Sequence, residues 1–189
     1  MHQNSILIMT SFSTNLNPNL NLSILDVGSY NVNGTYKPLF ENQNWKYTGL
    51  DIVEGPNVDI TVDKYGEWKN IQDNSFDVII SGQCLEHVES PWLIAKGIER
   101  VLKPGGVIFI VVPFLQGIHR YPIDCWRILP DGLEYLFCRH CSLNKLLCGV
   151  KKGDSFFCGV KDTNLNVDEN KLKTYWKDLA KKDKEVRMF

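Results

Sequence analysis

The segment from His119 to Arg127 holds side chains that could act on a bound molecule. Its nine residues include two arginines, a histidine, an aspartate, a tyrosine and a tryptophan. A histidine can remove a proton from an acceptor hydroxyl, and guanidinium groups suit a phosphate or carboxylate. We therefore expect His119 to be a general base oriented by Asp124, acting on a small acceptor that can be anionic. The other polar and aromatic side chains of the loop are predicted to bind this acceptor: Arg120, Tyr121, Trp126 and Arg127.

The same loop also has a purely structural interpretation. Arg127 would form a salt bridge with Asp124 or Glu134, and Trp126 would pack in the core. Both interpretations can hold at once. A second candidate base is His87, which follows Glu86; the alternative there is an acid at a helix start beside a packed histidine.

A glycine-bounded turn follows the apolar run Ile24–Val27 in the string ILDVGSYNVNG. Glycine at position 28 lets the backbone approach a ligand closely. The turn lacks the G-x-G-x-x-G spacing that receives a pyrophosphate, which favours a ligand without one. Asp51 ends the next apolar run and could accept hydrogen bonds from both hydroxyls of a ribose, so adenosine is the leading ligand. Taken singly, the turn could be a plain connection and Asp51 a solvated loop acid.

The elements that would position these residues alternate between short apolar runs and helical patterns. A helix is predicted after Ser90, with Pro91 as its first residue and Lys103–Gly106 as its stop. A shorter helix is expected at 129–137, and an amphipathic surface helix at 168–184. Residues 1–22 lack sustained periodicity and are predicted to be a loose lead-in.

Seven strands are expected. They are Ile24–Val27, Tyr47–Leu50, Val58–Val62, Phe76–Ile80, Val107–Val112, Leu143–Val150 and Ser155–Lys161. The near-continuous apolarity of the first five favours a parallel sheet, and the turn at Lys152–Asp154 predicts that the last two form an antiparallel hairpin. The predicted fold class is therefore α/β: a Rossmann-like, doubly wound, mostly parallel seven-stranded sheet with a C-terminal antiparallel hairpin.

The composition fits one globular domain, residues 1–189. The chain has 43% hydrophobic and 23% charged residues and a formal net charge of -1, so no positive field indicates nucleic acid or an anionic membrane as a partner. Apolar runs such as Val107–Val112 are too short to span a bilayer. No export segment is evident, so a cytoplasmic location with reduced cysteines is expected. Cys138 and Cys141 have the spacing of half a zinc site without a second pair, and no metal is expected there.

Five strings, in order, carry a resemblance to a known family. They are LDVGSYNVNGTYKPLF, YTGLDIVEGPNVDI, FDVIISGQCLEHVESPW, RVLKPGGVIFIVVPF and HRYPIDCWRILPDGL, within residues 23 to about 137. Together they resemble the class I S-adenosylmethionine-dependent methyltransferases, specifically the type 11 methyltransferase domain family. One departure is Tyr30, which stands where most relatives have a second glycine. The NVNG and HRYP-DCWR strings resemble a subgroup found with surface-polysaccharide biosynthesis.

The resemblance implies that S-adenosyl-L-methionine is the cofactor and S-adenosyl-L-homocysteine the product. By position, the residues implied around its methionine part are Asp26, Gly28, Ser29, Tyr30 and Asn33. Asp51 is implied to hold the ribose, Ile52 to pack on adenine, and Asp63 and Lys64 to border the adenine edge. The residues implied beside the sulfonium are Ser81, Gly82 and Gln83.

The function implied is methyl transfer, for which no metal is required. The expected reaction is O-methylation of a small sugar- or phosphate-linked precursor of a surface polysaccharide or capsule. A module that binds the cofactor without turnover, as a sensor or partner subunit, is the alternative. A dehydrogenase is disfavoured by the missing phosphate-binding glycines. The sequence leaves the oligomeric state open.

Overall fold

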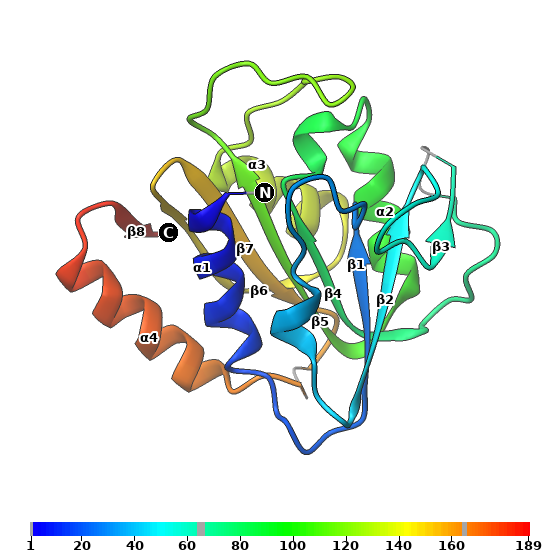
Figure 1. Cartoon of the computed structure of the whole chain (residues 1–189). Coiled ribbons are helices and arrows are strands. Elements are labelled where there is room, and N and C mark those ends of the chain that lie inside the picture. The colour runs from blue at the N-terminus through cyan, green and yellow to red at the C-terminus, as the bar shows by residue number, and fades with distance from the viewer. Residues whose placement is uncertain (1, 64–66, 164–165) are drawn as a thin grey trace.

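Apolar runs of the sequence become the strands of one twisted sheet in the computed structural model, which describes residues 2–63, 67–163 and 166–189 (Figure 1). The sheet has eight strands in the order β3-β2-β1-β4-β5-β7-β6-β8. In chain order they are β1 (Leu22–Val27), β2 (Trp45–Asp51), β3 (Ile60–Thr61), β4 (Phe76–Gly82), β5 (Leu102–Pro113), β6 (Asn144–Lys151), β7 (Asp154–Val160) and β8 (Val186–Met188). The pairs among β1 to β5 are parallel, and β7, β6 and β8 add antiparallel pairs.

Successive residues of a strand point to opposite faces of the sheet, and this period divides the core in two. Leu25, Ile79 and Ile108 belong to one buried cluster, while their neighbours Ile24 and Val78 belong to the other. Because both faces are covered, the central strands need apolar residues at nearly every position. Burial on both faces of the sheet therefore explains the near-continuous apolar runs of the sequence.

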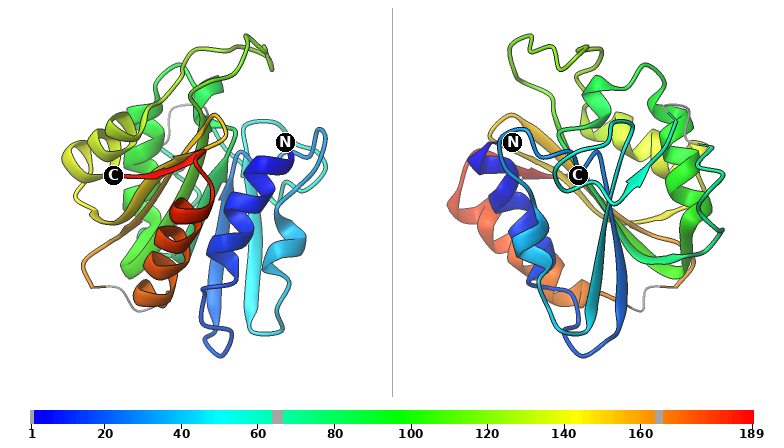
Figure 2. Two further views of the ribbon diagram at one scale, coloured as in Figure 1. Left: turned by 90° about the vertical axis from the view of Figure 1, so that its left-hand side faces the viewer. Right: turned by 45° about the vertical axis from the view of Figure 1, so that its right-hand side comes forward.

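Helices cover each face, as Figure 2 shows in its two views. The helices α1 (Gln3–Ser13) and α4 (Glu169–Lys182) and the 3-10 turn η1 (Lys37–Phe40) lie on one side. The other side carries α2 (Pro91–Val101), α3 (Pro130–Glu134) and the π-helical turn η3 (Tyr135–His140) that continues α3. Within the described ranges, no helix is both long and apolar enough to cross a membrane.

Helix α2 begins where it was predicted, with Ser90 at the N-cap and Pro91 in the first turn. It ends at Val101, and the predicted stop at Lys103–Gly106 is instead the start of β5. Gly105 has φ of +79°, so the chain turns sharply within this stretch, and its N–H donates to the Lys161 carbonyl at 2.6 Å. A backbone donor thus joins this turn to the end of the hairpin.

The prediction of a loose lead-in at 1–22 was wrong. Residues Gln3–Ser13 form α1, in which Ile8, Met9 and Phe12 are fully buried. The Phe12 ring stacks on Phe109 of β5 with centroids 4.6 Å apart. The many Asn and Ser residues concealed a short apolar face whose helical spacing needs β5 as a partner.

The count of seven strands was also wrong, because Val186–Met188 pairs with β6 as an eighth strand. Three residues are too few to show a period in the sequence. The added strand covers the edge of β6, which would otherwise expose unpaired backbone groups. The predicted hairpin is present, with β6 and β7 joined at Lys152–Gly153.

Candidate functional site

Gly28 and Asp51 meet where β1 and β2 end. Gly28 has φ of +81°, and a side chain there would place its Cβ 2.4 Å from the sulfur of Cys84. Its N–H donates to the Leu50 carbonyl at 2.8 Å. The backbone N–H of Tyr30 donates to Asp51 Oδ2 at 2.9 Å, so the carboxylate also holds the turn itself. The structure therefore brings together the two features that the sequence predicted to receive adenosine.

Asp26 lies beneath this turn and is fully enclosed. The hydroxyl of Tyr47 donates to its Oδ2 at 2.5 Å. Burial raises the pKa of Asp26 to about 7, against the opposing effect of the Tyr47 hydrogen bond. A carboxylate in this position can take up or lose its proton near neutral pH.

A loop at 52–58 is fastened to the turn after β1. Ser29 Oγ donates to the Asn57 carbonyl at 2.9 Å, and Asn57 Nδ2 donates back to the Ser29 carbonyl at 3.0 Å. Asn57 has φ of 70°, a conformation that Asn tolerates better than most residues. Sequence reasoning missed Asn57 and Tyr47. The only signal was the Gly55-Pro56-Asn57 turn composition, which does not show what the turn contacts.

Residues from the start of α1 and the start of β7 contact Gln83 at the end of β4. Ser81 Oγ donates to the Val27 carbonyl at 2.8 Å, which fixes β4 against β1. Gln83 Nε2 donates to Asp154 Oδ1 at 3.2 Å, and His2 Nε2 lies 3.2 Å from Gln83 Oε1. The hydrogen bond to Asp154 raises the pKa of His2. His2 and Asp154 were absent from the sequence prediction because nothing in their local sequence indicates this contact.

The other predicted cofactor residues lie around this edge. Gly82 packs against Tyr36, whose ring a Cβ at position 82 would overlap. Ile52 is 49% exposed directly after Asp51, as an apolar surface for an adenine ring would be. Asn33 is exposed on the loop after the first turn, and Asp63 is exposed after β3. Lys64 lies outside the described residues.

Glu86, His87 and His119 form a cluster beside the end of β4. Glu86 and His87 belong to the 3-10 turn η2 (Leu85–His87), and His119 comes from the loop at 114–129. Glu86 Oε1 lies 3.6 Å from His87 Nε2 and 3.9 Å from His119 Nε2. The two imidazole rings are perpendicular, with centroids 5.0 Å apart. Both predicted base candidates are therefore brought together, around a carboxylate that was not among the predicted catalytic residues.

The carboxylate of Glu86 is completely buried. Among the described residues, no group makes a hydrogen bond of acceptable geometry to either oxygen. Burial raises its pKa to about 8, although its own backbone N–H and the charge of Arg127 favour the ionised form. A buried polar group without a partner is rare and costly, so this one calls for a functional explanation.

Asp124 accepts side-chain hydrogen bonds from Arg127 and not from the His119 ring. Arg127 donates to both Asp124 oxygens, at 2.6 and 2.7 Å, and these bonds hold the pKa of Asp124 well below its usual range. Asp124 Oδ2 lies 3.7 Å from His119 Nδ1, too far for a hydrogen bond, and accepts instead from the His119 backbone N–H at 2.6 Å. Asp124 and the His119 ring are therefore at ion-pair distance, but the expected hydrogen bond between their side chains is not formed, because the guanidinium is a stronger competitor.

Arg127 organises the loop. Besides Asp124, it donates to the carbonyls of Gln116, Gly117 and Trp126 at 2.7 to 3.0 Å. With these donors engaged, the structural interpretation of Arg127 is the better one, and its expected contact with the acceptor has no geometric support. The Trp126 indole donates to the Val88 carbonyl at 2.8 Å but stays 38% exposed, so it does not pack in the core.

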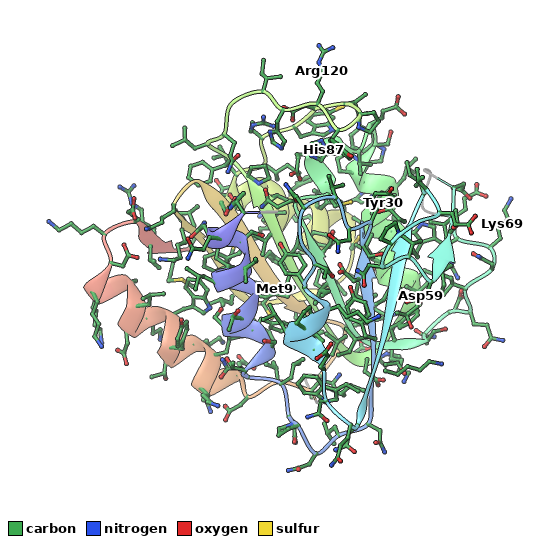
Figure 3. The ribbon with its side chains drawn as sticks, in the orientation of Figure 1. Met9, Tyr30, Asp59, Lys69, His87 and Arg120 are labelled. Atoms are coloured by element: carbon green, nitrogen blue, oxygen red, sulfur yellow. The ribbon has the colours of Figure 1, made fainter. Side chains whose placement is uncertain are left out.

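Arg120 and Tyr121 remain at the surface of the loop. Figure 3 shows Arg120 at the outer tip of the loop, pointing away from the sheet, with His87 below it. Tyr121 is 60% exposed. Of the four predicted acceptor-binding residues, Arg120, Tyr121 and Trp126 have surfaces that a ligand can reach.

The residues at the carboxyl edge of the sheet fit an S-adenosyl compound. Gly28 has φ of +81° and lets Cys84 pack against the turn, and each oxygen of Asp51 can accept a further hydrogen bond beside the one it already has. The exposed Ile52 follows directly. Ligands in open α/β sheets bind at this edge, outside the carboxyl ends of the strands.

Comparison with known proteins finds similarity to methyltransferases. Residues 25–110 match the family model described as Methyltransferase domain. Over 73 residues the chain is 32% identical to thiol S-methyltransferase TMT1B of Rattus norvegicus. That alignment covers 39% of this chain and 26% of the relative, so the chain spans about a quarter of the length of the curated relatives it matches.

Solved structures confirm the fold class. A SAM-dependent methyltransferase of Aquifex aeolicus matches with a TM-score of 0.58 and 16% identity, over 77% of this chain and 85% of that one. The 1,6-didemethyltoxoflavin-N1-methyltransferase of Burkholderia thailandensis, solved with S-adenosylhomocysteine, matches with a TM-score of 0.60 and 17% identity, over 76% and 72%. These structures agree in fold with this chain, and residues 25–110 are similar to methyltransferase domains. The polysaccharide subgroup stays a prediction.

Proposed function

We propose that this chain, whose residues 25–110 match a methyltransferase domain, is an S-adenosylmethionine-dependent methyltransferase acting on a small acceptor. The observation that carries the proposal is that the Gly28 turn and Asp51 lie together at the carboxyl ends of β1 and β2. The Tyr30 N–H of this turn donates a hydrogen bond to the Asp51 carboxylate. The family match supports the reaction class, and this geometry supports a cofactor site at this edge.

In this proposal the chain holds the cofactor with groups already fixed in place. Asp51 accepts the ribose hydroxyls, Ile52 packs on the adenine, and the backbone after Gly28 lies along the methionine part. Because Tyr47 and Asn57 fix Asp26 and Ser29, the turn needs little reordering when the ligand binds. When bound, S-adenosylmethionine supplies a methyl group that is already activated on a sulfonium.

The chain then has to align the acceptor, exclude water and manage a proton. An acceptor oxygen must lie about 3 Å from the methyl carbon in line with the departing sulfur. For an alcohol, His119 is the proposed proton acceptor and His87 the second candidate. The Nε2 atoms of both histidines face Glu86, whose carboxylate would stabilise an imidazolium formed by proton transfer.

The proposed acceptor is a small sugar- or phosphate-linked molecule that is methylated on oxygen. The exposed rings of Tyr121 and Trp126 suit the face of a sugar, and Arg120 is the free guanidinium of the loop segment for an anionic group. The NVNG and HRYP-DCWR strings add the resemblance to surface-polysaccharide enzymes. A thiol acceptor, as in the name of the rat relative, is the outcome to test against it.

A non-catalytic cofactor-binding module is the less favoured alternative. Such a module would need the cofactor edge but would have no use for two histidines and a buried carboxylate beside the end of β4. The cluster therefore favours turnover over binding alone.

The test has two stages. Titration calorimetry with S-adenosylmethionine should give one site per chain, with NAD as the negative control; binding of NAD instead would overturn the proposal. Release of S-adenosylhomocysteine is then measured with nucleotide sugars, phosphorylated glycan precursors and small thiols. Turnover of thiols alone would replace O-methylation with S-methylation, and cofactor binding without turnover of any acceptor class would support the binding module.

A further inference from the structure

We propose that Glu86, His87 and His119 together bind one divalent transition-metal ion next to the proposed methyl-transfer site. The three side chains offer one carboxylate oxygen and two imidazole nitrogens, all within 4.8 Å of one another. The expectation from the sequence was that the chain binds no metal, and it had weighed only the Cys138–Cys141 spacing. A carboxylate and two histidines from two separate segments could be recognised as a set only after folding.

The buried carboxylate is the first observation behind this assignment. The Glu86 side chain has no exposed surface, and neither of its oxygens is hydrogen-bonded by a described residue. The charge of Arg127 acts on Glu86, but Arg127 donates its hydrogen bonds to Asp124 and to backbone carbonyls. Glu86 is thus aimed at the two histidines without being bonded to either, and a cation between the three would satisfy it.

The histidines are oriented as metal ligands. His87 Nδ1 lies 2.5 Å from the Ile123 carbonyl, and His119 Nδ1 lies 3.0 Å from the Gly117 carbonyl. A carbonyl can only accept, so a neutral His87 ring carries its proton on Nδ1 and keeps the Nε2 lone pair free. At His119 the 3.0 Å contact of Nδ1 with the Gly117 carbonyl favours the same tautomer over the longer contact of Nδ1 with Arg127 Nη2, at 3.5 Å. These Nε2 atoms are the ones that face Glu86. Hydrogen bonds from the far nitrogen to a carbonyl are the usual means of fixing a metal-binding tautomer.

The spacing suits a single ion after a small movement of one ring. Ligand atoms about 2.0–2.2 Å from an ion lie about 3.0–3.5 Å from each other. The present separations from Glu86 Oε1 are 3.6 Å and 3.9 Å. His119 lies on the loop with its side chain 40% exposed, so its ring can move toward Glu86 without disturbing the core.

The donor set selects the class of ion. Two imidazoles with one carboxylate suit Mn²⁺, Fe²⁺, Co²⁺, Ni²⁺ or Zn²⁺, whereas Mg²⁺ and Ca²⁺ prefer oxygen ligands. Three protein ligands leave coordination positions for the acceptor. The His119 side chain is 40% exposed, so an acceptor would approach the ion from the side of this residue.

This inference rests on the proposed function and changes the role of the histidines within it. A bound ion would lower the pKa of a coordinated acceptor hydroxyl, which would release its proton to water. The acceptor oxygen then forms a bond to the methyl carbon as the carbon–sulfur bond breaks, and the electron pair stays on the sulfur of S-adenosylhomocysteine. The histidines would act as ligands and would not take up the proton.

The experiment uses the full-length protein without a polyhistidine tag, stripped with a chelator. Zn²⁺ is titrated by calorimetry, and Co²⁺ by its visible absorption spectrum. We expect one ion per chain, a Co²⁺ spectrum without an intense thiolate band, and affinity reduced by about 100-fold or more in His119→Ala, beyond the 10–100-fold cost of losing an outer partner. Glu86→Gln should have the same effect.

Two controls separate this site from other donors. His140→Ala removes a histidine near Trp92, away from the cluster, and should bind Zn²⁺ like the wild type. The double variant Cys138→Ser and Cys141→Ser should also bind like the wild type. Binding that survives His119→Ala and Glu86→Gln but is lost in the cysteine variant would overturn the proposal.

S-adenosylmethionine affinity is measured on the same stripped samples. Cofactor binding without any bound Zn²⁺ or Co²⁺ would refute the metal site and leave the methyltransferase proposal standing, with the cluster as a histidine–glutamate ion pair. Metal binding without cofactor binding would support the metal site and refute the methyltransferase proposal. Circular dichroism of each variant shows whether it is folded, so a loss of metal through unfolding is recognised.

Discussion

The two halves of the carboxyl edge of the sheet differ in how completely their polar groups are satisfied. On the cofactor side, Asp26, Ser29 and Asp51 each have a hydrogen-bond partner at 2.5–2.9 Å. On the acceptor side, Glu86 is buried without one, and it faces two histidine nitrogens at 3.6 Å and 3.9 Å. Polar groups that already have hydrogen-bond partners are pre-organised to hold a ligand without rearranging. Buried polar groups without partners indicate that a bound ion or reactant supplies the missing partner.

The two sides also differ in backbone. The cofactor turn is tied to strands β1 and β2 and to the 52–58 loop. The acceptor side includes residues 114–129, a long irregular connection with Leu115 and Ile118 at 75% and 86% exposure that rises above the sheet in Figure 1. Substitutions on the cofactor side should therefore affect binding and stability, while those on the acceptor side should affect turnover.

The largest effect is expected for His119→Ala. Loss of this imidazole, as base or as ligand, should lower turnover by about 10² to 10⁴ while S-adenosylmethionine affinity stays nearly unchanged. The assay is release of S-adenosylhomocysteine with the acceptor found by screening, and cofactor affinity is measured by calorimetry. His87→Ala is the comparison. Full rates in both variants across pH 6 to 9 would remove histidine from the mechanism and leave alignment of a pre-ionised acceptor.

Asp51→Ala tests the other side. It should weaken S-adenosylmethionine binding by roughly 1–3 kcal/mol, because ribose hydroxyls lose their acceptor and the Tyr30 N–H loses its partner. Titration calorimetry measures the change. Asp59→Ala is a control on the neighbouring segment, since its carboxylate accepts from the Gly49 N–H and is not assigned to the cofactor. Unchanged affinity in Asp51→Ala would exclude Asp51 from the cofactor site.

Asp26 should make the stability of the protein depend on pH. Burial raises the pKa of Asp26 to about 7 from 3.8, so the folded state binds the proton more tightly than the unfolded chain. The contribution of Asp26 to the free energy of unfolding is therefore greatest below about pH 4 and falls as the pH rises to about 7. Asp26→Asn carries no charge, so its stability relative to the wild type should increase by about 3–4 kcal/mol between pH 4 and pH 8.

Urea unfolding of the cofactor-free proteins, followed by circular dichroism at several pH values, measures this difference. Glu86 titrates in both proteins, so its contribution cancels in the comparison. A difference that does not vary with pH would show that Asp26 is ionised throughout, despite its burial.

The smallest effect should come from the arginines. Arg120→Ala should raise KM by about three- to tenfold for an anionic acceptor and leave KM for a neutral one unchanged. Arg127→Ala should instead increase proteolysis within 114–129, because Asp124 and three carbonyls lose their donor. A rise in KM for Arg127→Ala without increased proteolysis would return this residue to the acceptor site.

The sequence by itself determined the sheet and the strand ends at which the proposed cofactor residues lie. Apolar runs with two buried faces have a recognisable composition, and the Gly28 turn and Asp51 follow such runs directly, so their places at strand ends could be read locally. The same local reading failed for α1 and β8. The first has a short apolar face among polar residues, and the second has three residues, so each is stabilised by contacts with β5 or β6 that no local pattern encodes.

Only the tertiary structure decided the acceptor side. The sequence offered Asp124 as a partner for both His119 and Arg127, and the fold gave it to Arg127, whose paired donors match both carboxylate oxygens. It also placed His119 against Glu86 and His87, more than thirty residues earlier in the chain. Strand ends are set by period and composition within a few residues, whereas the meeting of side chains from distant loops depends on how the whole sheet brings those loops together.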